Sequence, residues 1–267
     1  MAFTWVSGHN QIVELELPNY LVTRYEGFAN TPVELQTQKS PYQHGTTLID
    51  TILSERNCNM NLIIIGRSKQ EKMEKRRQLI KAFSPRIGMG KLKWYQEGLE
   101  KEFILEAMPD EAPMIPSGSE GVLHQEAVIN LMAPDPTWYS GINTIEYNTA
   151  ETGRVNVYND GDVETSVQII IEGACENPEV INMTTGEKIE LNGVTLLEGE
   201  KISINTKYGV KTATHYDSDQ RRSNMLGKLG VSSVMFYLQA GSNQIEVRTT
   251  SGNPMVELKF KSRYGGV

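Results

Sequence analysis

The sequence predicts a mainly β protein with two β-rich domains and one α-helix in the first of them. Three observations lead to this fold class. Short segments alternate apolar and polar side chains with the period of a strand, and turn residues separate them. The chain of 267 residues is 39% apolar and contains 23 glycines and 11 prolines, which suits many short strands around a core. One segment has helical character, and one proline-rich segment interrupts the strands near the middle of the chain.

The first third begins with strands. Residues 13–17 alternate apolar side chains with glutamates, so they predict a half-buried strand that ends at Pro18. Residues 61–65 are more uniformly apolar and predict a more fully buried strand that ends at Gly66.

The predicted helix covers about residues 68–84. Ser68 is a candidate N-cap, strong helix formers follow it, and Ser84-Pro85 ends the segment. The charges along it favour a solvated face with Glu–Lys pairs over a patch for nucleic acid or a protein partner. Apolar side chains at helical spacing are expected to form one stripe, made of Met73, Leu79, Ile80 and Phe83.

Strands resume after the helix, and a long alternating strand at 123–131 leads directly to Pro134 and Pro136. A proline has no N–H for a sheet ladder, so two prolines two positions apart force the chain to leave the sheet. We expect a stiff hinge here, in which Trp138 and Tyr139 pack the second domain against the first. The predicted hinge residues are Pro134, Asp135, Pro136, Trp138 and Tyr139.

The proline segment sets the predicted domain boundaries. The N-terminal domain covers 1–133, the hinge 134–145 and the C-terminal domain 146–267.

The second half reads as almost pure β. Residues 159–162, Asn-Asp-Gly-Asp, predict a hairpin turn rather than a calcium loop, because the ligand series of such a loop does not continue. Strands at 180–183 and 188–191 flank Thr-Thr-Gly-Glu and predict a hairpin. Further short strands are expected at 154–158, 167–173, 202–204, 235–238, 245–247 and 256–260. Even spacing without a helix predicts a β-sandwich or jelly roll.

Composition excludes several classes of function. The formal net charge is −7, from 26 basic and 33 acidic residues, whereas proteins that bind DNA tightly display a basic surface. Cys58 and Cys175 are too isolated for a disulfide framework or a zinc motif. The first residues lack the pattern of a secretory signal, and the apolar run at 62–65 is too short to span a bilayer. We therefore expect synthesis in a cytoplasm and no membrane insertion.

No motif predicts chemistry. The four histidines, at positions 9, 44, 124 and 215, do not have metal-ligand spacing. Residues 88–91, Gly-Met-Gly-Lys, lack the first glycine and the final Ser or Thr of a phosphate loop, so a turn before a strand is favoured. We expect no catalytic residue, no metal and no cofactor.

Four aromatic residues could line a sugar-binding platform on a jelly roll: Trp138, Tyr139, Tyr208 and Tyr216. Packing in a core or an interface is the favoured interpretation for the group. Tyr208 and Tyr216 are retained as candidate carbohydrate contacts.

Segment 129–139, Ile-Asn-Leu-Met-Ala-Pro-Asp-Pro-Thr-Trp-Tyr, resembles the inter-domain signature of the distal tail protein family of long-tailed, non-contractile phages. The helix that ends at 83–85 has the place expected for this family. The resemblance covers nearly the whole chain and rests on the order and spacing of its motifs. It continues through 158–162, 171–173 with 177–178, 181–187, 202–206 and 238–243.

The resemblance implies a β-sandwich or split-barrel N-terminal domain with one helix, and a galectin-like or jelly-roll C-terminal domain. It implies a homo-hexameric ring at the virion tail tip, assembled in the cytoplasm of a bacterial host. The ring would be a hub between the tail-tube protein and the tail-associated fibre, lysin or receptor-binding proteins. Its channel would let DNA pass without specific binding, and the acidic net charge suits such a conduit.

Two other functions compete with the hub. One is a carbohydrate-binding module that recognises host cell-wall sugars, which the predicted jelly roll and its aromatic residues allow. The other is a tail-associated hydrolase, which needs a carboxylate pair or a Cys–His pair that the sequence does not offer. The hub is the preferred hypothesis, and we predict that the chain is not an enzyme.

Overall fold

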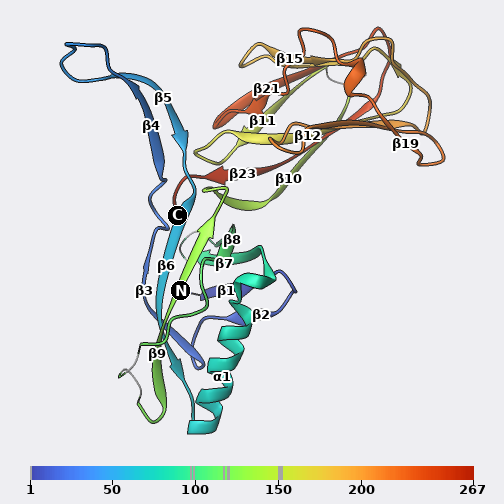
Figure 1. The fold of residues 1–267 in the computed structure, drawn as a ribbon. Coiled ribbons are helices and arrows are strands. Elements are labelled where there is room, and N and C mark those ends of the chain that lie inside the picture. Colours follow the sequence, from blue (N-terminus) through green and yellow to red (C-terminus); the bar gives the residue numbers. More distant parts are fainter. Residues whose placement is uncertain (1, 97, 99, 117, 119–120, 150–152) are drawn as a thin grey trace. The chain divides into compact units, whose positions relative to one another are not determined.

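The structure is a computed structural model that describes residues 2–96, 98, 100–116, 118, 121–149 and 153–267. Two compact units make up the chain (Figure 1). Unit 1 contains the residues up to Ser140 and the last four residues, Tyr264–Val267, and unit 2 contains Gly141–Arg263. The polypeptide therefore passes between the units twice, in strand β10 (Trp138–Asn148) and at the end of strand β23 (Met255–Tyr264).

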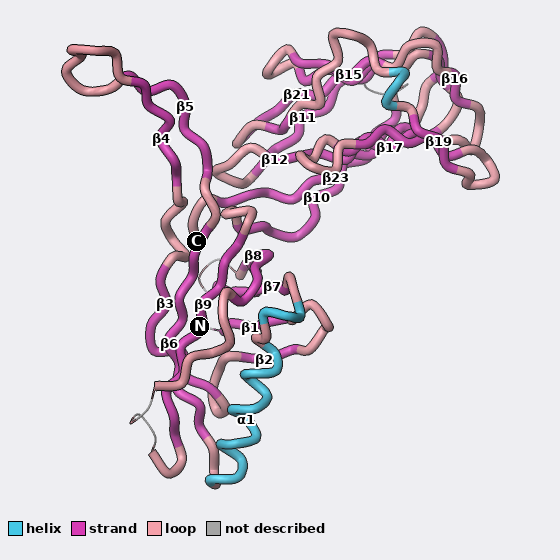
Figure 2. The backbone as a smooth tube through the Cα atoms, in the orientation of Figure 1, coloured by secondary structure: helices cyan, strands magenta, loops and turns pink. Residues whose placement is uncertain are grey.

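Unit 1 contains two antiparallel groups of strands, and Figure 2 shows how strands dominate the backbone. One group has the order β2–β1–β7–β8 and the other the order β3–β6–β9, while a short pairing of β8 with β9 connects them. Their bounds are β1 Ala2–Val6, β2 Ile12–Glu14, β3 Tyr20–Glu26, β6 Arg56–Ile65, β7 Gly90–Gln96, β8 Lys101–Pro109 and β9 His124–Ala133.

The strands of unit 1 bury alternate residues. In β6, Met60, Leu62 and Ile64 are buried while Ile63 and Ile65 are only half-buried, so this strand is less enclosed than its apolar sequence predicted. The reason is the period of two, which turns successive side chains to opposite faces of a sheet. Strand β2 is shorter than the strand expected at 13–17, because it pairs with only three residues of β1.

Helix α1 (Lys69–Ala82) lies within the predicted range and begins as expected, with the Ser68 hydroxyl accepting a hydrogen bond from the Glu71 N–H at 3.1 Å. A short 3-10 helix, Pro85–Ile87, follows it.

The predicted stripe of α1 is wrong at one position. Ile80 is exposed, and Lys72 is buried instead, with its Nζ donating to the Gly121 carbonyl at 2.7 Å. Lys72, Leu79 and Phe83 are seven and eleven residues apart and therefore share one face, whereas Ile80 is rotated about 100° away.

Unit 2 is a β-sandwich. One sheet has the order β11–β21–β14–β15, and the other continues from β23 through β12, β17 and β18 to β19. Alternate residues from both sheets share one buried core, which includes Val180 and Ile245 of the first sheet and Ile169 and Ile202 of the second. The fold is thus mainly β, with one α-helix among the described residues, as predicted.

The remaining elements complete unit 2, which also contains a short 3-10 helix, η2 (Leu226–Lys228). The predicted hairpin is formed by β14 and β15, which pair around Thr184–Gly186. The strand bounds are β11 Arg154–Asn159, β12 Thr165–Glu172, β13 Cys175–Glu176, β14 Glu179–Asn182, β15 Glu187–Glu190, β16 Thr195–Leu196, β17 Lys201–Asn205, β18 Thr212–Tyr216, β19 Arg222–Asn224, β20 Tyr237–Leu238, β21 Gly241–Arg248 and β22 Ser251–Gly252.

The prediction of a hairpin at residues 159–162 is wrong. This turn connects β11 and β12, which belong to different sheets, so the chain crosses the sandwich there instead of reversing within one sheet. Turn-forming residues determine where the chain bends but not which strands then pair.

The two units differ in extent from the ranges expected at 1–133 and 146–267. Residues 134–140 and 264–267 belong to unit 1, because Trp138 lies in the core of that unit. That segment 134–145 acts as a hinge remains a prediction. Within the described residues, no helix combines the length and the apolar character that crossing a bilayer requires.

Candidate assembly surfaces

Strands β4 (Val33–Gln38) and β5 (Thr47–Leu53) form a hairpin that projects from the rest of unit 1 (Figure 1). We call residues 33–53 the arm. The two strands pair with each other and with no other described strand, and every residue in both strands is exposed. A two-stranded hairpin alone is at best marginally stable in water, so this element requires a partner surface.

One face of the arm is apolar. Val33 lies opposite Leu53, and Leu35 lies opposite Thr51, so these side chains share a face. The register shifts after Gln36, which places Thr37 opposite Leu48 and adds a third leucine to that face. Leu35 and Leu48 are 59% and 58% exposed. The opposite face carries Glu34, Gln36, Asp50 and Ile52, which makes the arm amphipathic.

The base of the arm is held by Arg56, the first residue of β6. Its side chain is 1% exposed and has no carboxylate partner among the described residues. The guanidinium instead donates to five backbone carbonyls, those of Gly27, Phe28, Asn30, Pro136 and Gly265. The first four of these hydrogen bonds are 2.5–3.0 Å long. Burial lowers the pKa of the guanidinium. One cation therefore joins β6 to three other backbone segments beneath the arm, at residues 27–30, 136 and 265.

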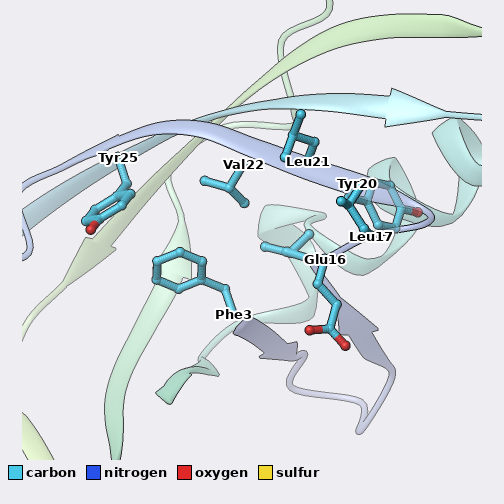
Figure 3. A pocket seen from close by; sticks show the side chains of 8 residues that line it. Phe3, Glu16, Leu17, Tyr20, Leu21, Val22 and Tyr25 are labelled. Atoms are coloured by element: carbon cyan, nitrogen blue, oxygen red, sulfur yellow. The ribbon is translucent and has the colours of Figure 1, made fainter. Parts of the chain in front are cut away.

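A pocket of about 360 Å³ lies where β3 faces β1 and the loop after β2 (Figure 3). Phe3, Tyr20 and Tyr25 line it together with the exposed side chains of Leu17 and Leu21. The Tyr20 hydroxyl donates to the Lys75 carbonyl at 3.1 Å, and burial raises the pKa of Tyr20 to about 12. The pocket is thus mostly apolar and sized for one or two aliphatic side chains.

The predicted hinge residues are tied to unit 1. Trp138 is fully buried, its indole N–H donates to the Phe28 carbonyl at 3.2 Å, and its ring contacts Phe28 and Trp94. The Asp135 carboxylate accepts hydrogen bonds from the side chains of Thr137 and Tyr139. Trp138 and Tyr139 are buried and cannot form a sugar platform.

The two candidate carbohydrate contacts lie at opposite ends of the β17–β18 hairpin. Tyr208 is in the connecting loop and is highly exposed, whereas Tyr216 ends β18 opposite Lys201. They therefore do not form one platform. Their role in sugar binding stays a prediction.

A polar triplet that the sequence did not suggest lies at the edge of unit 2. His215 Nε2 is 3.3 Å from Glu200 Oε2, and His215 Nδ1 is 3.4 Å from Ser223 Oγ. Both contacts are longer than those by which a base activates a nucleophile, so we assign no chemistry to them. Among the described residues, no cluster of His, Cys, Asp and Glu side chains could hold a metal ion.

Both halves of the chain match families of phage tail proteins. Residues 13–111 match the phage tail protein RIFT-related domain, and residues 160–264 match the C-terminal domain of the siphovirus-type tail component. Together the two matches cover most of the chain. No curated protein sequence matches it.

Solved structures share the fold along the full length. The crystal structure of the Dit protein of phage SPP1, described as a paradigm of the hub adsorption apparatus in phages that infect Gram-positive bacteria, aligns with a TM-score of 0.73 and 14% identity. That alignment covers 98% of this chain and 99% of that one.

Two structures of the phage p2 baseplate in its activated conformation, with strontium and with calcium, align with TM-scores of 0.57 and 0.56 at 10% and 11% identity. Each alignment covers 100% of this chain and 99% of the other. These likenesses concern the fold, while the two family matches concern the sequence itself. The chain belongs to the siphovirus distal tail protein family.

Proposed function

We propose that this chain is the hub of a phage tail tip, in which six copies form a ring. The ring joins the tail-tube protein to the tail-associated fibre, lysin or receptor-binding proteins, and its channel lets DNA pass. The number of six copies rests on the family resemblance. The chain acts as structural material without catalytic chemistry, and it assembles in the host cytoplasm.

The observation that carries this proposal is the exposed apolar face of the arm. In a ring each subunit presents two different surfaces, one that donates and one that accepts. The arm is suited to donate, because Leu35, Leu48 and Leu53 face outward from a hairpin that cannot be stable alone. The apolar pocket with Leu17 and Leu21 at its edge is suited to accept. The arm of one copy therefore docks on unit 1 of the next.

Replacing Leu35 with glutamate is expected to weaken each contact between copies about 30-fold, because burying one leucine contributes about 2 kcal/mol. Native mass spectrometry should then find monomers where the unaltered chain forms rings. Gln36→Glu is the matched control: it adds the same charge on the opposite face of the arm, so rings should persist.

A mixing experiment tests whether the contact joins two different surfaces. Leu21→Glu places a charge at the edge of the pocket and leaves the arm intact. Alone, Leu35→Glu and Leu21→Glu should each be monomeric, whereas their equimolar mixture should form dimers through one intact arm and one intact pocket. Rings in either single variant, or an unaltered chain that is monomeric at every concentration, would contradict the proposal.

The proline segment supports a second prediction. The double variant Pro134→Gly and Pro136→Gly should loosen unit 2 and leave ring assembly intact, because glycine removes the restriction on φ that proline imposes. Limited proteolysis within 134–145 should accelerate about tenfold or more, since each glycine adds roughly 1 kcal/mol of chain entropy. Loss of the rings would instead assign this segment to the ring interface.

A further inference from the structure

One row of side chains on the outer face of the second sheet of unit 2 has the composition of a ligand site. Lys201 of β17, Tyr216 of β18 and Arg222 of β19 are direct neighbours across three adjacent strands. Their side chains point away from the core, because the residues that alternate with them, Ile202 and Ile204, are buried. The three strands are hydrogen-bonded neighbours at the edge of the sheet.

The Tyr216 ring lies between two cations. Lys201 Nζ is 5.7 Å from the ring centroid, and Arg222 Cζ is 5.4 Å from it. Neither cation forms an ion pair with a carboxylate in the part of the chain that the structure describes, and the Glu172 carboxylate beside Lys201 is not within ion-pair distance. Two cations about 10 Å apart, separated by an aromatic ring, present concentrated positive charge on a protein of net charge −7.

A second row, about 7 Å further along the strands, carries hydroxyl and amide groups. Ser203, Thr214 and Asn224 are neighbours there in the same order. Ser203 Oγ accepts from Gln168 Nε2 at 2.9 Å, and Asn224 Oδ1 accepts from the Leu226 N–H at 2.9 Å. Their remaining donors, the Ser203 O–H and the Asn224 amide N–H groups, point to the same face and are available to a ligand.

We propose that these two rows bind an acidic glycan. The cations pair with carboxylate or phosphate groups on the glycan, with the planar guanidinium able to bind such a group in a bidentate manner. The hydroxyl of Tyr216, whose ring lies between the two cations, and the second row bind sugar hydroxyls by hydrogen bonds. A neutral glycan leaves the two cations without partners. A single-stranded nucleic acid requires a basic groove with several stacking residues, whereas this face offers one ring.

The test uses the full chain and two anionic probes, oligogalacturonate and a chain of hexose phosphates. Fully methyl-esterified oligogalacturonate, which has the same rings without the charge, is the neutral counterpart. Calorimetry should detect at least one anionic probe bound at least tenfold more tightly than the neutral one. Arg222→Gln and Tyr216→Ala should each weaken that binding at least fivefold, and added salt should weaken it in the unaltered chain.

Lys211→Gln is the matched control, because it removes one positive charge from the same hairpin outside both rows. It should bind as the unaltered chain does. The proposal is overturned if neither anionic probe binds, if the neutral probe binds equally, if Lys211→Gln weakens binding as much as Arg222→Gln, or if a single-stranded oligonucleotide of equal charge binds more tightly. Ring assembly is measured separately and should be unchanged in all of these variants.

Discussion

Replacing Arg56 with alanine is expected to lower the free energy of unfolding of unit 1 by about 3–5 kcal/mol. The side chain is buried, and its removal leaves several backbone carbonyls without a donor, at a cost of about 1–3 kcal/mol for each one that water does not reach. It also leaves a cavity beneath the arm. Water entry and local relaxation recover part of the sum, which is why the expected loss is smaller than the separate costs added together.

Tryptophan fluorescence isolates unit 1 in this measurement, because all three tryptophans, Trp5, Trp94 and Trp138, lie in its core. Denaturant unfolding followed by that signal gives the free energy directly. Arg77→Ala, on the exposed side of α1, is the control and should cost less than about 0.5 kcal/mol.

Arg56→Lys separates charge from geometry. An ammonium group keeps the charge but cannot distribute donors over five carbonyls from three segments, so it should recover only part of the lost stability. Full recovery by lysine would show that charge alone stabilises the site. Equal stability of Arg56→Ala and the unaltered chain would show that water replaces the guanidinium.

The elements that the sequence predicted correctly are those that depend on local periodicity. The helix at 69–82, the hairpin of β14 and β15 and the long strand β9 all follow from spacing and turn residues within short windows. Strand pairing is different, because it depends on segments far apart in the chain. The turn at 159–162 had the right chemistry for a bend but led to another sheet.

The arm is a second case in which a local sequence pattern does not determine the tertiary contacts of a segment. Val33, Leu35 and Thr37 alternate with polar residues, which is the pattern of a half-buried strand. Nothing in that signal distinguishes burial within the chain from burial against another copy. Only the structure shows that the residues of both strands are exposed and that no other described strand pairs with them.

The role of Arg56 could not be predicted from the sequence either. A single arginine at the start of an apolar strand gives no sequence signal, because its five carbonyl partners come from backbone positions between 27 and 265. The resemblance predicted the family correctly, since it used the order of motifs along the whole chain. It did not predict individual side-chain contacts such as those of Arg56.

Deleting residues 264–267 is expected to destabilise unit 1 by about 3 kcal/mol, although these residues follow unit 2 in the sequence. The Tyr264 ring packs edge-on against Phe103 at 5.1 Å, and Lys101 Nζ lies 4.6 Å from its centroid. The Gly265 carbonyl accepts from Arg56 and from Thr31 Oγ1. Tryptophan fluorescence should therefore show earlier unfolding.

Gly266→Ala tests the same contact with the chain at full length. A Cβ at this position would lie 2.0 Å from the Ala29 carbonyl oxygen, so the last residues must shift away from unit 1. We expect a loss of about 2 kcal/mol, in the range of an overpacked site. Gly98→Ala, also in unit 1, is the matched control, since a Cβ there meets nothing within 4 Å. If both variants unfold alike, the last residues do not stabilise unit 1. If only Gly266→Ala is destabilised, unit 1 depends on residues at both ends of the chain, and its folding requires residues 264–267 as well as 2–140.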